Sequence, residues 1–207
     1  LERLCEGVDN HLAAIAAARR KYEVIRALSE ALKDPVLARG IDRALATLRQ
    51  EVGFEHLVLL FVHEDALEHG ALRYRVHRDG APLHGSEDVR DPAVDGFMRE
   101  HAAVFLAGDD AAVRARFGIT RCREEVLITG LRTTRVLGRL LVTSRQGEFH
   151  THDRELLDRF ADYLRQRVVD FNREWKTLSQ VFSTAVCERL MSEEGYAARW
   201  LTPRERD

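Results

Sequence analysis

The spacing of apolar side chains changes several times along the chain, and each spacing predicts a different element. Over residues 1–33 the apolar positions recur at alternating intervals of three and four residues, which predicts one long helix. The same helical spacing returns over residues 36–51. Between the two stands Asp34-Pro35, and Pro is tolerated in the first turn of a helix. The chain therefore begins with two helices joined by a short connection.

Strand-like patterns follow the second helix. Residues 57–62 form an uninterrupted apolar run, which predicts a central strand covered on both faces. Residues 71–78 alternate strictly between apolar and polar side chains, which predicts a strand with one face in water. A turn over residues 64–70 would join the two strands as a hairpin.

The second half of the chain is organised around residues 135–171. An apolar run over residues 136–142 predicts a strand, and from about residue 152 the spacing becomes helical. Residues 125–131 predict a further strand, whereas residues 83–122 have no single period. The order of these elements predicts an α+β fold with a meandering antiparallel sheet.

Both terminal helices carry an apolar seam with heptad spacing. Such a seam is typical of a parallel dimer or a helix bundle, and the alternative is a helix packed on its own domain. The second seam continues beyond Phe171, which favours contact with a partner over contact with the domain. We therefore predict a homodimer held by coiled-coil helices. The predicted contacts are Leu4, Val8, Ile15, Ile25, Leu164, Val168, Phe171, Trp175, Leu178 and Phe182.

Composition narrows the choice of partners. The 207 residues carry a net charge of -2, so electrostatic attraction to nucleic acid or to an anionic membrane is not expected. The sequence contains no apolar run of the roughly 18 residues that a membrane-spanning helix needs. The three cysteines stand far apart, which fits a reducing compartment better than a disulfide framework. We expect a cytoplasmic protein, and a chain without an initial Met is expected to be part of a longer one.

The sequence offers little catalytic chemistry. His150 and His152 flank Thr151 beside Asp153, a spacing that could seat a metal ion. They also lie at a predicted helix N-terminus, whose partial positive charge disfavours a cation, so surface polar residues are the simpler interpretation. A phosphate-binding glycine loop, a Ser/His/Asp set and suitably paired carboxylates are all missing from the sequence. We predict neither a catalytic residue nor a metal site.

Residues 126–171 resemble the C-terminal half of a GAF domain. Members of that family show a strand, an apolar strand with a glycine, a glycine turn, a Phe, an Asp and then a Leu-rich helix. By element order alone the resemblance extends back to about residue 30. The matching positions here are Val126-Leu127-Ile128, Leu137-Gly138-Arg139-Leu140, Gly147, Phe149, Thr151, Asp153 and Leu156-Leu157.

The tail is similar to the segment that precedes a class III adenylate/guanylate cyclase domain. Phe182, Val186 and Leu190 have the spacing of the helix found there, and Pro203 to Asp207 match the basic and acidic run that follows. The resemblance implies a sensor region of a cyclase, with the catalytic domain beyond residue 207. It requires no cofactor in this chain, whereas the parent cyclase would use a divalent metal such as Mg²⁺.

Together the resemblances imply three segments. Residues 1–33 would be an N-terminal signalling helix, residues 34–172 the GAF-like sensor domain, and residues 173–207 an exit helix and linker. A small-molecule ligand, if one binds, would lie between the sheet and the irregular middle of the domain. The side chains expected there are Phe97, Met98, Phe105, Arg114, Phe117 and Thr129.

Other outputs and other GAF chemistries stay open. The same sensor could precede a histidine kinase or a transcription activator. A thiol-dependent reductase of the methionine-sulfoxide type is disfavoured because only Cys122 lies in the domain body, and Cys122-Arg123 lacks the Cys-His pair typical of bilin attachment. The motif of cyclic-nucleotide-binding GAF domains is half present, since Phe149 and Asp153 are kept and Arg154 replaces Glu.

Overall fold

The computed structural model describes the backbone of residues 2–68, 71–79, 87–89, 105–107, 125–128, 138–144, 148–193 and 195. The described helices are α1 (Glu2–Leu32), α2 (Leu37–Glu51), α5 (Thr151–Ser179) and α6 (Thr184–Ser192). The described strands are β1 (Phe54–Glu68), β2 (Ala71–Asp79), β3 (Glu87–Val89), β4 (Phe105–Ala107), β5 (Glu125–Ile128) and β6 (Gly138–Ser144).

The strands form one sheet in the order β3-β2-β1-β6-β5-β4. Every pairing in it is antiparallel. The first described strand, β1, and the last, β6, therefore lie side by side in the centre of the sheet. Their register shifts between Phe54 and His56, where the hydroxyl of buried Thr143 accepts the His56 amide at 3.1 Å. The predicted antiparallel sheet and the predicted hairpin of β1 and β2 are confirmed.

The central strand is longer than predicted. Its apolar run is buried throughout: Leu57, Leu59 and Phe61 belong to the main core, and the alternating Val58, Leu60 and Val62 are buried as well. Because successive side chains of a strand point to opposite faces, both faces of β1 are covered, as the sequence predicts. The predicted turn over residues 64–70 is wrong for most of its length, since β1 continues to Glu68 through two register shifts.

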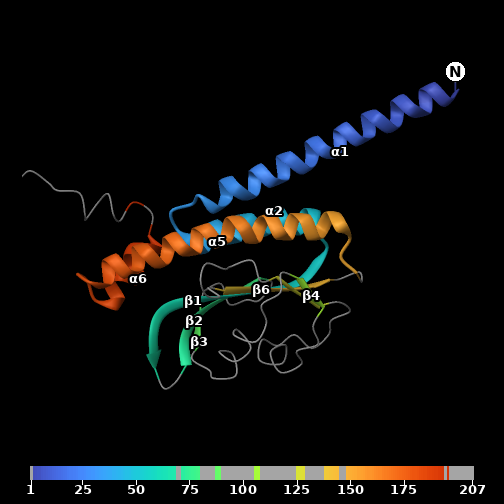
Figure 1. Cartoon of the computed structure of the whole chain (residues 1–207). Coiled ribbons are helices and arrows are strands. Elements are labelled where there is room, and N and C mark those ends of the chain that lie inside the picture. Colours follow the sequence, from blue (N-terminus) through green and yellow to red (C-terminus); the bar gives the residue numbers. More distant parts are fainter. Residues whose placement is uncertain are drawn as a thin grey trace, which may run out of the picture.

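The described helices form a layer on one side of the sheet (Figure 1). In α2, Leu37, Ile41, Ala44, Leu45 and Leu48 are buried, at the spacing of one helix face. In α5, the ring of Phe171 meets Phe61 of β1 edge-on at a centroid distance of 6.0 Å and stacks on Trp175. Next to this contact, the Asn172 side-chain amide donates to the Val62 carbonyl at 2.8 Å. These contacts fix α5 against the central strand.

The C-terminal half of the predicted dimer seam is corrected. Leu164, Val168, Phe171 and Trp175 are buried inside the single chain, and Leu178 and Phe182 pack against the same core. The heptad spacing is real, but it serves the helix layer of the chain itself. The exit helix also ends earlier than predicted, at Ser179, so that Phe182 lies in the turn before α6.

The core extends beyond the predicted domain limits. Val24, Leu28, Ala31 and Leu32 of α1 are part of it, and so is Cys187 of α6. The predicted limits at residues 33/34 and 172/173 therefore both fall inside one packed unit. Ile25, predicted as a dimer contact, is partly buried against this core.

The first two thirds of α1 extend away from the core (Figure 1). Val8, Leu12, Ile15 and Tyr22 are large apolar side chains that stay 55–67% exposed. Of the predicted contacts, Val8 and Ile15 are thus on the surface, and Leu4 lies in α1, where its side chain is outside the described part. Among the helices that the structure describes, none has the length and apolar character needed to cross a membrane.

Candidate functional site

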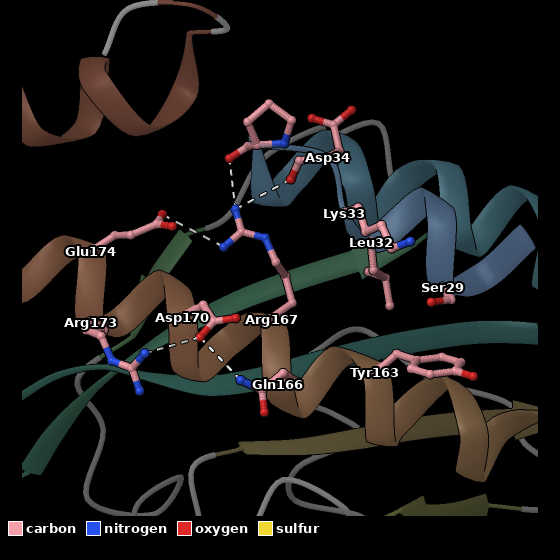
Figure 2. A pocket seen from close by; sticks show the side chains of 11 residues that line it. Ser29, Leu32, Lys33, Asp34, Tyr163, Gln166, Arg167, Asp170, Arg173 and Glu174 are labelled. Carbon is pink, nitrogen blue, oxygen red and sulfur yellow. Dashed lines mark hydrogen bonds and ion pairs between the residues drawn. The ribbon is translucent and has the colours of Figure 1, made fainter. Parts of the chain in front are cut away.

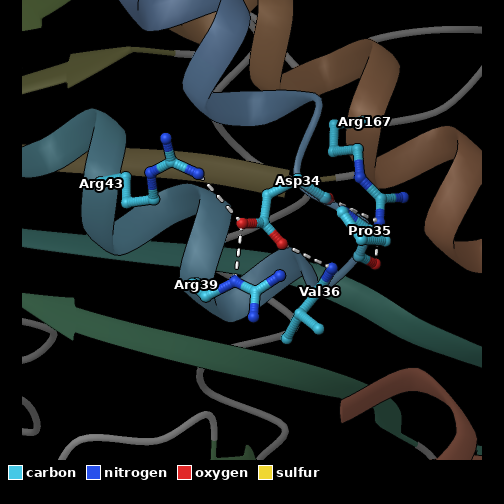
Figure 3. Close-up of polar contacts among 6 residues, drawn as sticks. All are labelled: Asp34, Pro35, Val36, Arg39, Arg43 and Arg167. Atoms are coloured by element: carbon cyan, nitrogen blue, oxygen red, sulfur yellow. Dashed lines mark hydrogen bonds and ion pairs between the residues drawn. The ribbon is translucent and has the colours of Figure 1, made fainter. Parts of the chain in front are cut away.

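The connection between α1 and α2 is built around a buried carboxylate. We call its residues 33–36 the elbow. The side chain of Asp34 is 3% exposed and accepts from Arg39 Nε at 2.7 Å, Arg43 Nη1 at 3.3 Å and the Val36 amide at 2.9 Å (Figure 3). The hydrogen bond from Arg39 is the largest reason why the pKa of Asp34 lies below its usual range. Asp34 thus holds the start of α2 to the end of α1.

A side chain of α5 closes the elbow from the other side. Arg167 Nη2 donates to the Pro35 carbonyl at 2.8 Å and lies 3.5 Å from the Asp34 carbonyl (Figures 2 and 3). Its Nη1 forms an ion pair with Glu174 at 3.8 Å. The Arg167 side chain is only 12% exposed, so this guanidinium is a structural part of the helix layer.

A cleft of about 470 Å³ opens beside this contact, between the end of α1 and α5 (Figure 2). That volume lies within the usual range for small-molecule sites. Two acidic side chains in the cleft have partners within it. Asp170 interacts with Gln166 and Arg173, and Glu174 interacts with Arg167. The cleft is lined by Ser29, Leu32, Lys33, Asp34, Pro35, Tyr163, Gln166, Arg167, Asp170, Arg173 and Glu174.

A second cavity of about 460 Å³ lies between the elbow, the end of α5 and α6. Its wall is largely apolar, with Pro35 and Val36 from the elbow facing Leu178 of α5 and Leu190 and Met191 of α6. The elbow therefore borders α1, α2, α5 and α6. Neither cavity was predicted from the sequence.

The predicted ligand-pocket residues lie almost entirely outside the described part of the chain. Phe97, Met98, Arg114, Phe117 and Thr129 fall outside it. Phe105 opens β4, where the backbone pairs with Ile128 of β5. The ligand pocket therefore stays a prediction.

The start of α5 uses the residues of the half-present cyclic-nucleotide motif for its own stability. Phe149 is buried, and its carbonyl accepts from Arg154 Nε at 3.1 Å. The Asp153 carboxylate accepts the backbone amide of His150 at 2.9 Å, and His150 occupies the N-cap position. A carboxylate at this position also suits the positive end of the helix. These contacts give Phe149 and Asp153 a structural role at the start of α5.

Within the described ranges, no group of three or more His, Cys, Asp or Glu side chains could hold a metal ion. Cys187 is a free thiol in α6, fully buried, and burial raises its pKa. A raised pKa disfavours the reactive thiolate.

The sequence contained a partial signal for the side chains that hold the elbow. Asp34-Pro35 marks a helix end, and Arg39 and Arg43 stand one helix turn apart on the same face of α2. Arg167 offered no comparable signal, because its partners are main-chain carbonyls 132 and 133 residues away.

Comparison with solved structures places this arrangement among known folds. The GAF domain of a phosphoenolpyruvate-protein phosphotransferase from Acinetobacter superposes with a TM-score of 0.54, over 80% of this chain and 98% of that one. The chain has the GAF fold. The sequence identity is 12%, so the likeness concerns the fold alone.

Two further GAF domains align with lower scores. One belongs to a two-component sensor histidine kinase from Bacillus halodurans, with a TM-score of 0.44 and 15% identity over 63% of this chain and 91% of that one. The other is the phycoerythrobilin-bound GAF domain of a cyanobacterial phytochrome, with a TM-score of 0.44 and 14% identity over 72% of this chain and 97% of that one. No family model matches the chain, and no curated protein matches it.

Proposed function

We propose that this chain is the regulatory sensor region of a signal-transduction protein. The observation that carries the proposal is that the helix entering the GAF fold packs on the helix leaving it. α1 and α5 share one core, and Arg167 of α5 hydrogen-bonds the elbow that follows α1. A change in the domain or in α1 would therefore reach α6 (Thr184–Ser192) through packed helices.

The output that we propose is a class III adenylate or guanylate cyclase, working in the cytoplasm. The support is the similarity of the tail to the segment before such a domain. Of the three residues that carry this similarity, Val186 and Leu190 lie one turn apart in α6, whereas Phe182 lies in the turn before it. The parent cyclase would supply the divalent metal, and this chain would act as its regulator without a cofactor of its own.

We also propose that two copies pair through the projecting part of α1. Val8, Leu12, Ile15 and Tyr22 are exposed and fall on a 4-3-4-3 spacing, in which the position between Ile15 and Tyr22 is held by Arg19, ion-paired with Glu23 of the same helix. That spacing is the heptad of a coiled coil. Between residues 7 and 18 the only formal charge at pH 7 is Asp9, so this stretch has little polar surface to face water. A second copy presents the same face and covers it.

A fusion tests the output. The chain through Asp207 is joined to the catalytic domain of a class III cyclase, with one to four residues inserted after Lys176, inside the last turn of α5. Each residue inserted into the helix rotates the part of the chain that follows by about 100°. We expect cyclase activity to rise and fall with the helical period. Equal activity in every insertion would refute regulation through helix orientation.

The same insertion series in front of a histidine-kinase core tests the alternative output. A periodic response of the kinase together with a flat response of the cyclase would favour the kinase parent. A thiol-dependent sulfoxide assay on the isolated chain tests the reductase alternative, which measurable turnover would support.

The ligand side of the proposal concerns Phe97, Met98, Phe105, Arg114, Phe117 and Thr129. Native mass spectrometry of the purified chain tests for a co-purified small molecule. If one is found, we expect Arg114→Ala to release an anionic ligand, whereas Arg173→Ala, on the helix layer, should retain it. Loss of the molecule only in Arg173→Ala would move the site to the cleft beside the elbow.

A further inference from the structure

The elbow is held tightly to α2. Besides the three donors to the Asp34 carboxylate, the two helices approach closely at Gly40. A Cβ atom at that position would lie 3.0 Å from the Ala31 carbonyl oxygen and 3.2 Å from Asp34 Cβ. The absence of a side chain at Gly40 thus lets the end of α1 and the start of α2 pack closely.

The elbow is held to α5 by a different kind of contact. The apolar core that joins α1, α2 and α5 is stabilising, but its attraction is non-directional. The bonds from Arg167 to the Pro35 and Asp34 carbonyls are directional and charge-assisted. The described ion pair at the opposite end of the α1–α5 contact, Lys21 with Glu155, is solvent-exposed and contributes little.

Arg167 is also linked to α6 through its ion-pair partner. Glu174, its ion-pair partner, lines the apolar cavity together with Pro35, Leu190 and Met191. A rotation of α1 that moved the elbow would therefore act on α5 through Arg167 and on α6 across this cavity.

We infer that Arg167 is the positioning residue that couples the orientation of α1 to that of α5 and α6. With Arg167 in place, a displacement of the projecting part of α1 turns the elbow, α5 and α6 together. Without it, the helix layer stays packed, but α1 takes up more than one orientation relative to α6.

Pulsed electron–electron resonance measures the coupling directly. Spin labels are placed on Ala17→Cys in α1 and Glu188→Cys in α6, both exposed positions, with Cys5→Ser, Cys122→Ser and Cys187→Ala removing the native thiols. Dilution with unlabelled chain removes distances between copies. We expect one narrow distance distribution with Arg167, and a second population or a clear broadening in Arg167→Ala.

The matched control is Arg173→Ala. Arg173 lies on the same helix and lines both cavities, but its described ion pair is with Asp170 of its own helix, so the distance distribution should stay as narrow as in the unaltered chain. If Arg167→Ala does not fold, Arg167→Lys decides, because it keeps the charge but lacks the planar fork, and it should broaden the distribution. An unchanged distribution in the folded variant would overturn the inference, even if its unfolding midpoint fell. The measurement uses this chain alone, so its outcome does not depend on the cyclase fusion.

Discussion

Asp34 is the one described acidic side chain that is almost fully buried, and its three donors explain how it stays charged there. Burial alone would favour the neutral acid, but the bonds from Arg39, Arg43 and the Val36 amide outweigh it, so the pKa falls. The unfolded chain then binds a proton at a higher pH than the folded chain. The stabilisation is present above the ordinary pKa of about 3.9 and is lost as the pH falls through the lower folded value.

Asp34→Asn should therefore flatten the acid limb of the stability profile. We expect urea unfolding between about pH 6 and pH 3 to show a smaller loss of unfolding free energy in this variant than in the unaltered chain. Glu155→Gln serves as the control, because Glu155 pairs with Lys21 in solvent and its removal should change the slope little. Equal slopes for Asp34→Asn and the unaltered chain would contradict the role given to the carboxylate.

Leu164, a predicted seam residue of α5, and Leu12, an exposed apolar residue of α1, test which apolar face belongs to the core. Leu164 is fully buried, so Leu164→Ala should lower the unfolding free energy by about 2–5 kcal/mol. Leu12 is exposed, so Leu12→Ala should change it by no more than about 0.5 kcal/mol in dilute solution. Urea unfolding measures both. The reverse ranking would contradict the burial of Leu164 and the exposure of Leu12.

At the scale of elements, the sequence predicted those parts whose pattern has a single physical meaning. The alternation of β2 and the continuous apolar run of β1 could hardly be anything but strands, and both helices before them were predicted within a few residues. The seam of α5 was ambiguous, because a heptad spacing fits the chain's own core as well as it fits a partner. Burial of Trp175 against Phe171 decided the question, and that contact cannot be read from spacing.

The candidate site shows the same limit more strongly. The elbow depends on Arg167 meeting carbonyls at the far end of the chain, and main-chain acceptors carry no residue identity. The end of β1 was missed because its last residues, Glu64 to Glu68, include polar side chains that resemble a turn. Leu12 was not among the predicted contacts, although the structure leaves it exposed together with Val8 and Ile15.

Gly40 tests the close crossing of α1 on α2. An alanine in a helix interior normally stabilises it by about 1 kcal/mol relative to glycine. At Gly40 the added methyl would press on the Ala31 carbonyl, and overpacking of this kind costs about 1–3 kcal/mol, so Gly40→Ala should lower the unfolding free energy. Gly7 in the projecting part of α1 has open space, and Gly7→Ala should raise helix content by circular dichroism. A stabilising Gly40→Ala would show that the crossing is loose.

At the scale of the whole molecule, the proposed coupling of α1 to α5 and α6 has one structural requirement. A helix that leaves the core with Val8, Leu12 and Ile15 in water is poorly stabilised by itself, since most helical stability comes from packing of an apolar face. Pairing with a second copy would bury that face and place two domains in fixed relation. Displacement of α1 could then reach both exit helices through the elbow.

Light scattering coupled to size exclusion, at micromolar concentration, tests this claim most directly. The account predicts a mass twice the 23.7 kDa of the chain, and a single-chain mass for the double variant Leu12→Glu with Ile15→Glu. Glu23→Gln with Glu30→Gln, on the same helix but off the apolar face, should stay dimeric. A single-chain mass for the unaltered protein, or a dimer that survives both glutamates, would contradict the account.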